Sequence, residues 1–235
     1  MGSFVTLQAT DGHTFEAYFA VPSSTPRGGI VVIQEIFGVN SHICNITERF
    51  AEIGYMAIAP ALFDRFTPSF KSGYTSDEIA EGRRLKLEAN NDIDNVLLDV
   101  DAARKKISRS AGRVGIVGFC WGGVIAWLAA CRLQFNAASS YYGGGIVPFV
   151  DEKPNCPVIF HFGDQDSSIP LDKDVKIIRE KQTACPVYVY SADHGFNCDM
   201  RHQYDPYAAH VSGMRTILFF EKTLNGNESN YEATK

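Results

Sequence analysis

The feature of this sequence that most constrains its fold is an alternation of short apolar runs with longer segments of helical period. The runs hold four to six residues each and are bounded by turn signals, which suits strands buried on both faces of a sheet. They lie at residues 29–34, 55–59, 113–118, 137–141, 158–162 and 187–190, and the helical segments lie at 41–53, 92–108, 121–133, 171–181 and 207–224. This order predicts βαβ units and a mostly parallel central sheet with helices on both faces.

Two segments fall outside this alternation. Near the N-terminus, runs at 4–7 and 14–20 flank an Asp-Gly dipeptide at 11–12, which predicts an antiparallel hairpin at the start of the sheet. Residues 62–76 show no clear period, so we expect a surface excursion there, followed by a helical segment that Asp77 caps.

Length and composition restrict the domain organisation and the partners. α/β folds commonly hold about 200–250 residues in one domain, so we expect residues 1–235 to form a single domain with a frayed polar tail at 226–235. The net charge is −5 and no basic tract is present, which argues against nucleic acid and anionic membranes as partners. No apolar run approaches the roughly 18 residues of a membrane span, and the N-terminus shows no secretory signal pattern. The six scattered cysteines lack CxxC or paired His/Cys spacing, which favours reduced thiols in the cytoplasm over a disulfide frame or a zinc site. We expect a cytoplasmic monomer that acts on a small molecule.

The segment with the most chemical information is Gly-Phe-Cys-Trp-Gly-Gly at residues 118–123. It follows an expected strand and opens an expected helix, which is the setting of a nucleophile elbow, G-x-Nuc-x-G. The glycines leave room for the tight turn, and the start of a helix favours the thiolate form of Cys120. The alternative is a buried cysteine beside glycines that merely let the strand pack against the helix.

Two loops downstream supply the partners that a nucleophile needs. Asp164 and Asp166 follow one expected strand, and His194 follows the next. The carboxyl ends of the strands are where open α/β sheets build their sites. The chain order nucleophile, acid, histidine is that of α/β-hydrolases. Either aspartate is a candidate for the acid, and either is also a candidate turn residue.

In these residues the chain resembles the dienelactone hydrolases, or carboxymethylenebutenolidases. The most specific segments are Gln-Glu-Ile-Phe-Gly-Val-Asn at 34–40, the cysteine elbow, Tyr-Tyr-Gly at 141–143, and the loops of Asp166 and His194. The resemblance implies an α/β-hydrolase fold with a triad of Cys120, His194 and Asp166. The resemblance favours Asp166 over Asp164, because in the family the acid precedes the Ile-Pro step, here at 169–170, by the spacing that Asp166 has.

The resemblance also implies roles for residues around the triad. Glu35 matches a glutamate that contacts the nucleophilic thiol and takes its proton when substrate binds; the alternative is an ion-paired strand end. The backbone N–H groups of Ile36 and Trp121 would form the oxyanion hole.

The family's type enzymes hold a substrate carboxylate with two arginines. Arg83 and Arg84 are candidates for the first. The second position is Cys198 here, so Arg201, three residues further, is its candidate replacement. Tyr142 is a further candidate for the substrate pocket, although an aromatic residue at a strand end is more often part of a core.

The implied function is a cysteine-dependent hydrolase that opens enol-lactones, of the dienelactone to maleylacetate type, through a thioester acyl-enzyme. It calls for no metal and no organic cofactor. Two alternatives stay open. One is a hydrolase of small esters or other lactones with the same mechanism, and the other is a non-catalytic ligand-binding module on the same fold. The joint presence of Cys120, Asp166 and His194 favours an enzyme over the module.

Overall fold

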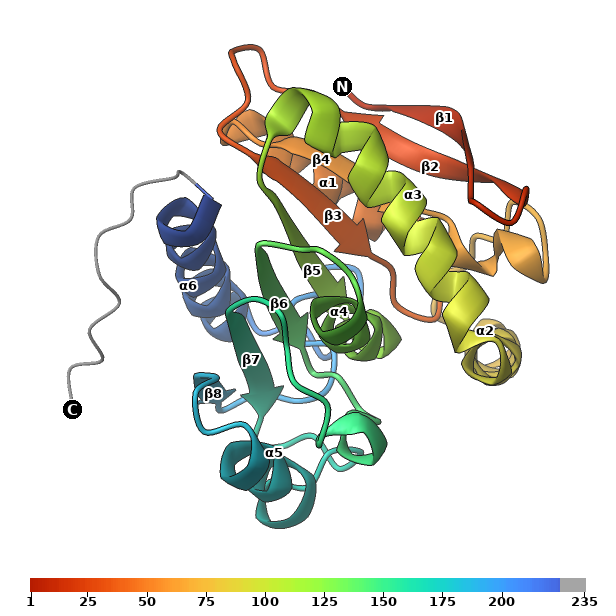
Figure 1. Cartoon of the computed structure of the whole chain (residues 1–235). Helices are drawn as coiled ribbons and strands as arrows, with labels where there is room; N and C mark the ends of the chain where they lie inside the picture. Colours follow the sequence, from red (N-terminus) through yellow and green to blue (C-terminus); the bar gives the residue numbers. More distant parts are fainter. Residues whose placement is uncertain (225–235) are drawn as a thin grey trace.

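The computed structural model describes residues 1–224 and contains one eight-stranded sheet (Figure 1). The tail expected at 226–235 lies outside the described residues. The strand order is β1-β2-β4-β3-β5-β6-β7-β8. The strands are β1 (Ser3–Gln8), β2 (Thr14–Ala20), β3 (Gly29–Ile33), β4 (Met56–Pro60), β5 (Val114–Phe119), β6 (Ala137–Tyr141), β7 (Val158–Gly163) and β8 (Val187–Tyr190).

The direction of the strands confirms the predicted architecture. Strands β3 to β8 pair in parallel, whereas β1 and β2 form the expected antiparallel hairpin and β2 joins β4 in antiparallel register. The central strands β3, β5, β6 and β7 are buried along their whole length. Their apolar runs therefore needed no alternation of polar and apolar residues.

Helices cover both faces of the sheet, as predicted. One face carries α1 (Ser41–Glu52) and α6 (Pro206–Leu224), whose Phe50 and Phe220 rings pack with centroids 6.1 Å apart. The other face carries α3 (Ile93–Ala111) and α4 (Trp121–Arg132) (Figure 1). The remaining helices are α2 (Ser76–Asn91), α5 (Lys176–Lys181), the 3-10 helices η1 (Leu62–Arg65) and η2 (Val147–Phe149), and the π-helix η3 (Leu171–Val175).

The prediction that residues 62–76 form a surface excursion is partly wrong. Its first residues form η1, and Leu62 and Phe63 are buried in the core. A single 3-10 turn is too short to show a period in the sequence, so the segment gave no helical signal. The N-cap of the following helix, α2, lies two residues earlier than expected. Thr75, and not Asp77, caps it through a reciprocal pair of hydrogen bonds with Glu78.

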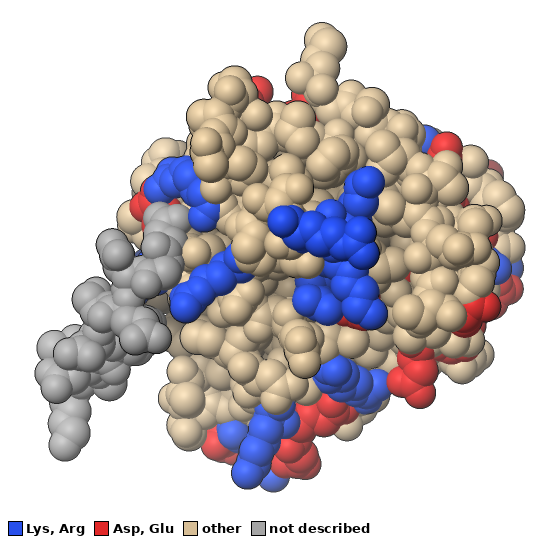
Figure 2. All heavy atoms as spheres, turned by 45° about the horizontal axis from the view of Figure 1, so that its top comes forward, with Lys and Arg blue, Asp and Glu red and all other residues tan. Residues whose placement is uncertain are grey.

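Basic side chains gather at the end of the molecule that Figure 2 turns toward the viewer. The second half of α3 contains Arg104, Lys105, Lys106 and Arg109, and Arg109 lies in the last turn, where the helix dipole favours positive charge. Because α3 ends shortly before β5 begins, this group lies at the amino end of β5, whereas Cys120 follows the carboxyl end. These cations therefore lie far from the elbow. Among the helices described within residues 1–224, none is both long and apolar enough to cross a membrane.

Candidate active site

The elbow of Cys120 is a strained turn at the end of the central strand β5. Cys120 has φ 55° and ψ −117°, a left-handed conformation that few non-glycine residues adopt. A Cβ at Gly118 would lie 1.8 Å from the carbonyl oxygen of Gly122, and a Cβ at Gly122 would lie 2.4 Å from the carbonyl oxygen of Gln34. Only glycine fits at these two positions. Strain of this kind persists where the surrounding structure fixes it, often at functional sites.

A continuous chain of hydrogen bonds joins Cys120, His194 and Asp166. Nε2 of His194 lies 3.1 Å from Sγ of Cys120, and Nδ1 of His194 lies 2.6 Å from Oδ2 of Asp166. The other carboxylate oxygen of Asp166 accepts a 2.8 Å hydrogen bond from the backbone N–H of Ser168. The structure thus brings together the three residues that the sequence selected. Each follows a different parallel strand, β5, β7 or β8, at its carboxyl end.

The two candidate aspartates differ in burial and in partner. Asp166 is 5% exposed and bonds His194, whereas Asp164, two residues earlier, is exposed. The backbone N–H of Asp164 donates to the carbonyl oxygen of Tyr190, which ties the loop to β8. The geometry therefore favours Asp166 as the acid.

The surroundings of His194 favour its protonated form. Burial of the imidazole opposes a positive charge, but the neighbouring Cys120 sulfur and the hydrogen bonds to Asp166 and Cys120 outweigh burial and raise the pKa of His194 to about 10. An imidazolium 3.1 Å from a sulfur atom stabilises the thiolate form of that sulfur. His194 can thus stay protonated near neutral pH beside the sulfur of Cys120.

Glu35 differs from the expectation drawn from the resemblance. Among the described residues it makes no hydrogen bond with Cys120, and its Oε1 instead accepts a 3.3 Å hydrogen bond from Nη1 of Arg201. Glu35 is only 1% exposed, so an opposite charge offsets much of the cost of burying it. Arg201 reaches this position across Gly195, where a Cβ would lie 2.6 Å from Nη1. His194, and not Glu35, is the hydrogen-bond partner of the thiol.

The arginine candidates fall in two different environments. Arg201 is largely buried beside Glu35 and lies over the ring of Phe37. Arg84 is exposed on α2, where it pairs with Glu81 and Glu88. Arg83 is exposed and makes no ion pair with any residue in the described part of the chain. Of these three arginines, Arg201 alone forms an ion pair with another candidate site residue in the described part of the chain. The guanidinium of Arg84 is held by its two ion pairs on the surface of α2.

Two backbone N–H groups, one in the loop after β3 and one at the elbow, have no acceptor among the described residues. Neither Ile36 nor Trp121 donates its backbone hydrogen to any group within residues 1–224. Ile36 lies in the loop after β3, and Trp121 is the first residue of α4. The indole of Trp121 is buried against Phe63, and its Nε1 donates to Asn90. Both backbone donors are available for an oxyanion.

Tyr142 packs against His194 of the triad. Its ring centroid is 5.1 Å from that of His194, and its backbone has φ 36°. The side chain is fully buried and its hydroxyl has no hydrogen-bond partner among the described residues. Burial, followed by the nearby charges of Glu35, Cys198 and Cys120, raises the pKa of Tyr142 well above its usual value. Tyr142 therefore packs the imidazole in place as a neutral phenol.

One cavity lies away from this chemistry. It has a volume of about 390 Å³ and is bounded by α1 and α6, on the face of the sheet opposite α4. Phe119 and Tyr141 line it from the sheet, but none of the three triad side chains does. We place the candidate active site at the elbow, because the hydrogen-bonded chain lies there.

The sequence and the fold both match known proteins. Residues 15–224 match the dienelactone hydrolase family. A protein of Synechocystis, provisionally named a carboxymethylenebutenolidase, is 36% identical over 213 residues, which cover 83% of this chain and 86% of that protein. The carboxymethylenebutenolidase of Pseudomonas putida is 31% identical over 224 residues, covering 92% and 94% of the two chains. A crystal structure from Klebsiella pneumoniae, provisionally named a dienelactone hydrolase, superposes with a TM-score of 0.78 at 30% identity and covers 93% of this chain and 98% of that one.

Proposed function

Because this chain belongs to the dienelactone hydrolase family and is a lactone or ester hydrolase, we propose that it opens enol-lactones through a thioester on Cys120. The observation that carries this proposal is the hydrogen-bonded chain from Cys120 through His194 to Asp166. A non-catalytic binding module would not require this geometry, and the family match favours a hydrolase over such a module.

In the first half of the proposed reaction, the lactone becomes bound to the enzyme as a thioester. The Cys120 thiolate attacks the lactone carbonyl, and the N–H groups of Ile36 and Trp121 stabilise the oxyanion that forms. The bond from the carbonyl carbon to the ring oxygen then breaks and expels an enolate, which takes the proton from Nε2 of the His194 imidazolium and leaves a neutral imidazole. An enolate is a good leaving group, so a thiolate suffices as the nucleophile. Amides, with poor leaving groups, should react badly.

In the second half, water cleaves the thioester. His194 accepts a proton from the water as it attacks the acyl carbon, and the thiolate leaves. Asp166 holds the proton on Nδ1, so Nε2 faces the reacting atoms. The product of a dienelactone is of the maleylacetate type. The triad returns to its starting state without a metal or an organic cofactor.

One observation favours a second candidate, hydrolysis of a small ester or of another lactone by the same steps. Cys198 stands where the resemblance leads us to expect an arginine that holds a substrate carboxylate, and a thiol cannot pair with a carboxylate. Arg201 replaces that charge only if it leaves Glu35 to bind the substrate. The charge of the substrate therefore separates the two candidates.

We expect Arg201→Ala to raise KM for a carboxylated enol-lactone about 10-fold or more and to change kcat/KM for a neutral p-nitrophenyl ester little. The reason is that only the charged substrate loses a bidentate partner. The test compares both substrates on wild type, Arg83→Ala and Arg201→Ala, with Arg84→Ala as the exposed control. Arg201→Lys serves as a second variant that keeps a cation beside Glu35. If neither arginine discriminates between the substrates, the carboxylated lactone is not the native substrate.

Glu35 gives a prediction about events after substrate binding. A substrate carboxylate that takes Arg201 would free Glu35 to exchange protons with the reacting groups, so Glu35→Gln should lower kcat on that substrate about 10-fold or more. In the absence of substrate, Glu35→Gln and the wild type should react with iodoacetamide at the same rate at each pH from 6 to 9. The reason is that the partner of Cys120 in the free enzyme is His194. A large change in the alkylation profile of Glu35→Gln would instead place Glu35 on the thiol before substrate binds.

A further inference from the structure

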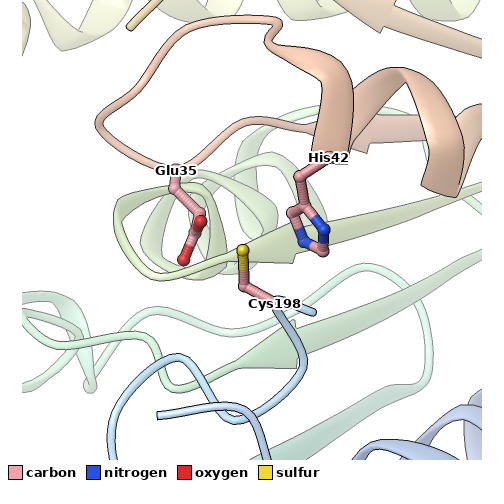
Figure 3. Close-up of side chains that lie close together, drawn as sticks. All are labelled: Glu35, His42 and Cys198. Carbon is pink, nitrogen blue, oxygen red and sulfur yellow. The ribbon is translucent and has the colours of Figure 1, made fainter. Parts of the chain in front are cut away.

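A cluster of three different donor groups lies beside the triad. Glu35, His42 and Cys198 are each buried, with exposed fractions of 1%, 1% and 0%. Each offers one donor atom, and these atoms lie within 4.8 Å of one another. Figure 3 shows a carboxylate, a thiol and an imidazole that come from three separate segments of the chain and converge on one space.

The cluster has bonding capacity that the protein does not use. Nε2 of His42 is buried and has no hydrogen-bond partner in the described part of the chain. Nδ1 of the same ring makes a 3.3 Å contact with Asp199, and Sγ of Cys198 lies 3.3 Å from the hydroxyl of Tyr74. Buried polar atoms without partners are uncommon in native structures and call for an explanation. A ligand that binds this set would supply the missing contacts.

We propose that Glu35, His42 and Cys198 form a binding site for a divalent transition-metal ion of the zinc type. A mixed set of sulfur, nitrogen and oxygen donors suits zinc, whereas calcium and magnesium take oxygen donors. Metal–donor distances of about 2.0–2.3 Å require the three donor atoms to draw closer than 4.8 Å, so the Glu35 and Cys198 side chains must rotate toward His42 when the ion binds. A water molecule would complete the tetrahedron.

The charges of the site balance around such an ion. A dication with the Cys198 thiolate, the Glu35 carboxylate and a neutral imidazole has no net charge, so the nearby Arg201 does not repel it. Tyr74 can donate its hydroxyl hydrogen to the metal-bound sulfur, and the Asp199 carboxylate can hold the imidazole ring. The cysteine is essential to this set. The arginine that the resemblance leads us to expect at position 198 would place a cation where the ligand sulfur lies.

Metal binding would regulate the hydrolase, a consequence that rests on the proposed role of Glu35. A carboxylate bound to the ion is withheld from the reaction, so we expect zinc to inhibit turnover reversibly. The metal site itself is independent of that role. Cys120 and His194 form a competing thiol–imidazole pair, which the tests must separate from the cluster.

The first test measures metal binding by the full chain in the Cys120→Ala background, which removes the competing thiol. Titration with Zn²⁺ against a chelator should give one ion per chain, and Co²⁺ should show thiolate-to-metal charge-transfer absorption. Adding Cys198→Ser or His42→Gln should weaken binding more than about 100-fold, beyond the loss typical of outer-sphere changes. Adding Cys156→Ala, in the loop before β7, should leave binding unchanged.

Two results would overturn the metal site. One is equal affinity for Zn²⁺ with and without Cys198, and the other is loss of all binding in Cys120→Ala, which would assign the ion to the triad. Cys198→Ser keeps a hydroxyl near Tyr74 and nearly the same volume, so it decides the matter if His42→Gln fails to fold. Neither result depends on which substrate the enzyme hydrolyses.

The second test measures inhibition on any ester or lactone that the wild type turns over. Zn²⁺ should inhibit the wild type, and Cys198→Ser should need more than about 100-fold more Zn²⁺ for the same fractional inhibition of its own metal-free rate. Equal inhibition of both proteins would overturn the regulatory role. Binding without inhibition would leave the metal site standing and count against the proposed part of Glu35 in turnover.

Discussion

Cys120→Ala is expected to lower kcat about 10³-fold or more while the protein stays folded. The variant loses the nucleophile but keeps a Cβ, so the left-handed backbone at position 120 bears the same strain as in the wild type. The oxyanion donors of Ile36 and Trp121 remain, which is why a residual rate above that in water is expected. Steady-state kinetics on an enol-lactone and on a p-nitrophenyl ester measure the loss, and circular dichroism confirms the fold.

The control for this variant is Cys156→Ala, which removes a thiol far along the chain from the elbow and should keep wild-type activity. Mass spectrometry of the wild type, quenched during turnover, should show the mass of one acyl group on the peptide that carries Cys120. Retention of more than a tenth of wild-type kcat by folded Cys120→Ala would remove the cysteine from the mechanism. That result would also exclude the proposed thioester intermediate on Cys120.

The sheet was predictable because each strand carries its own local signal. Strands such as β3 and β5 are buried on both faces, so their short β-branched runs stand out between helical segments. The hairpin of β1 and β2 was equally predictable, because the Asp-Gly dipeptide between the two runs marks the position of the turn. By contrast, η1 is one turn long, and its burial depends on tertiary contacts such as the packing of Phe63 against Trp121.

The candidate site was predictable to a smaller extent. Cys120 follows from the glycines of the elbow, which are a local requirement of the backbone. The choice between Asp164 and Asp166 rested on the resemblance, because both follow the same strand and only burial separates them. Burial depends on how the loop folds back over β8, and no residue spacing encodes that contact.

Contacts between segments far apart in the chain could not be predicted from the sequence. The partner of Glu35 is Arg201, which lies 166 positions away and reaches it only because Gly195 leaves room. The same is true of His42 and Cys198, which lie 156 residues apart by their numbers and match no metal-ligand spacing. Sequence spacing predicts metal sites when the ligands share one turn or one loop, and this cluster draws on three segments.

Asp166→Asn is expected to lower kcat on the order of 10³-fold, although the side chain keeps its size. The carboxylate accepts the hydrogen of Nδ1 and so leaves Nε2 facing the thiol; an asparagine amide can donate to Nδ1 and force the opposite tautomer. The loss of a negative charge also lowers the pKa of His194, which Cys120 and Asp166 together raise to about 10 in the wild type. As the pH rises, the variant therefore loses the imidazolium at a lower pH than the wild type does.

The change in the His194 pKa also predicts how the rate of alkylation depends on pH. In the wild type the raised pKa of His194 keeps the imidazolium up to about pH 10, and this positive charge beside Sγ of Cys120 promotes attack on iodoacetamide. In Asp166→Asn the imidazolium is lost at a lower pH, so the reaction with iodoacetamide near pH 7 should slow and should recover only as alkali ionises the thiol directly. Asp164→Asn is the matched control, because that carboxylate is exposed and makes no contact with His194. If Asp164→Asn and Asp166→Asn give the same activity and the same alkylation profile, Asp166 does not orient the histidine, and the acid of the triad must be sought elsewhere.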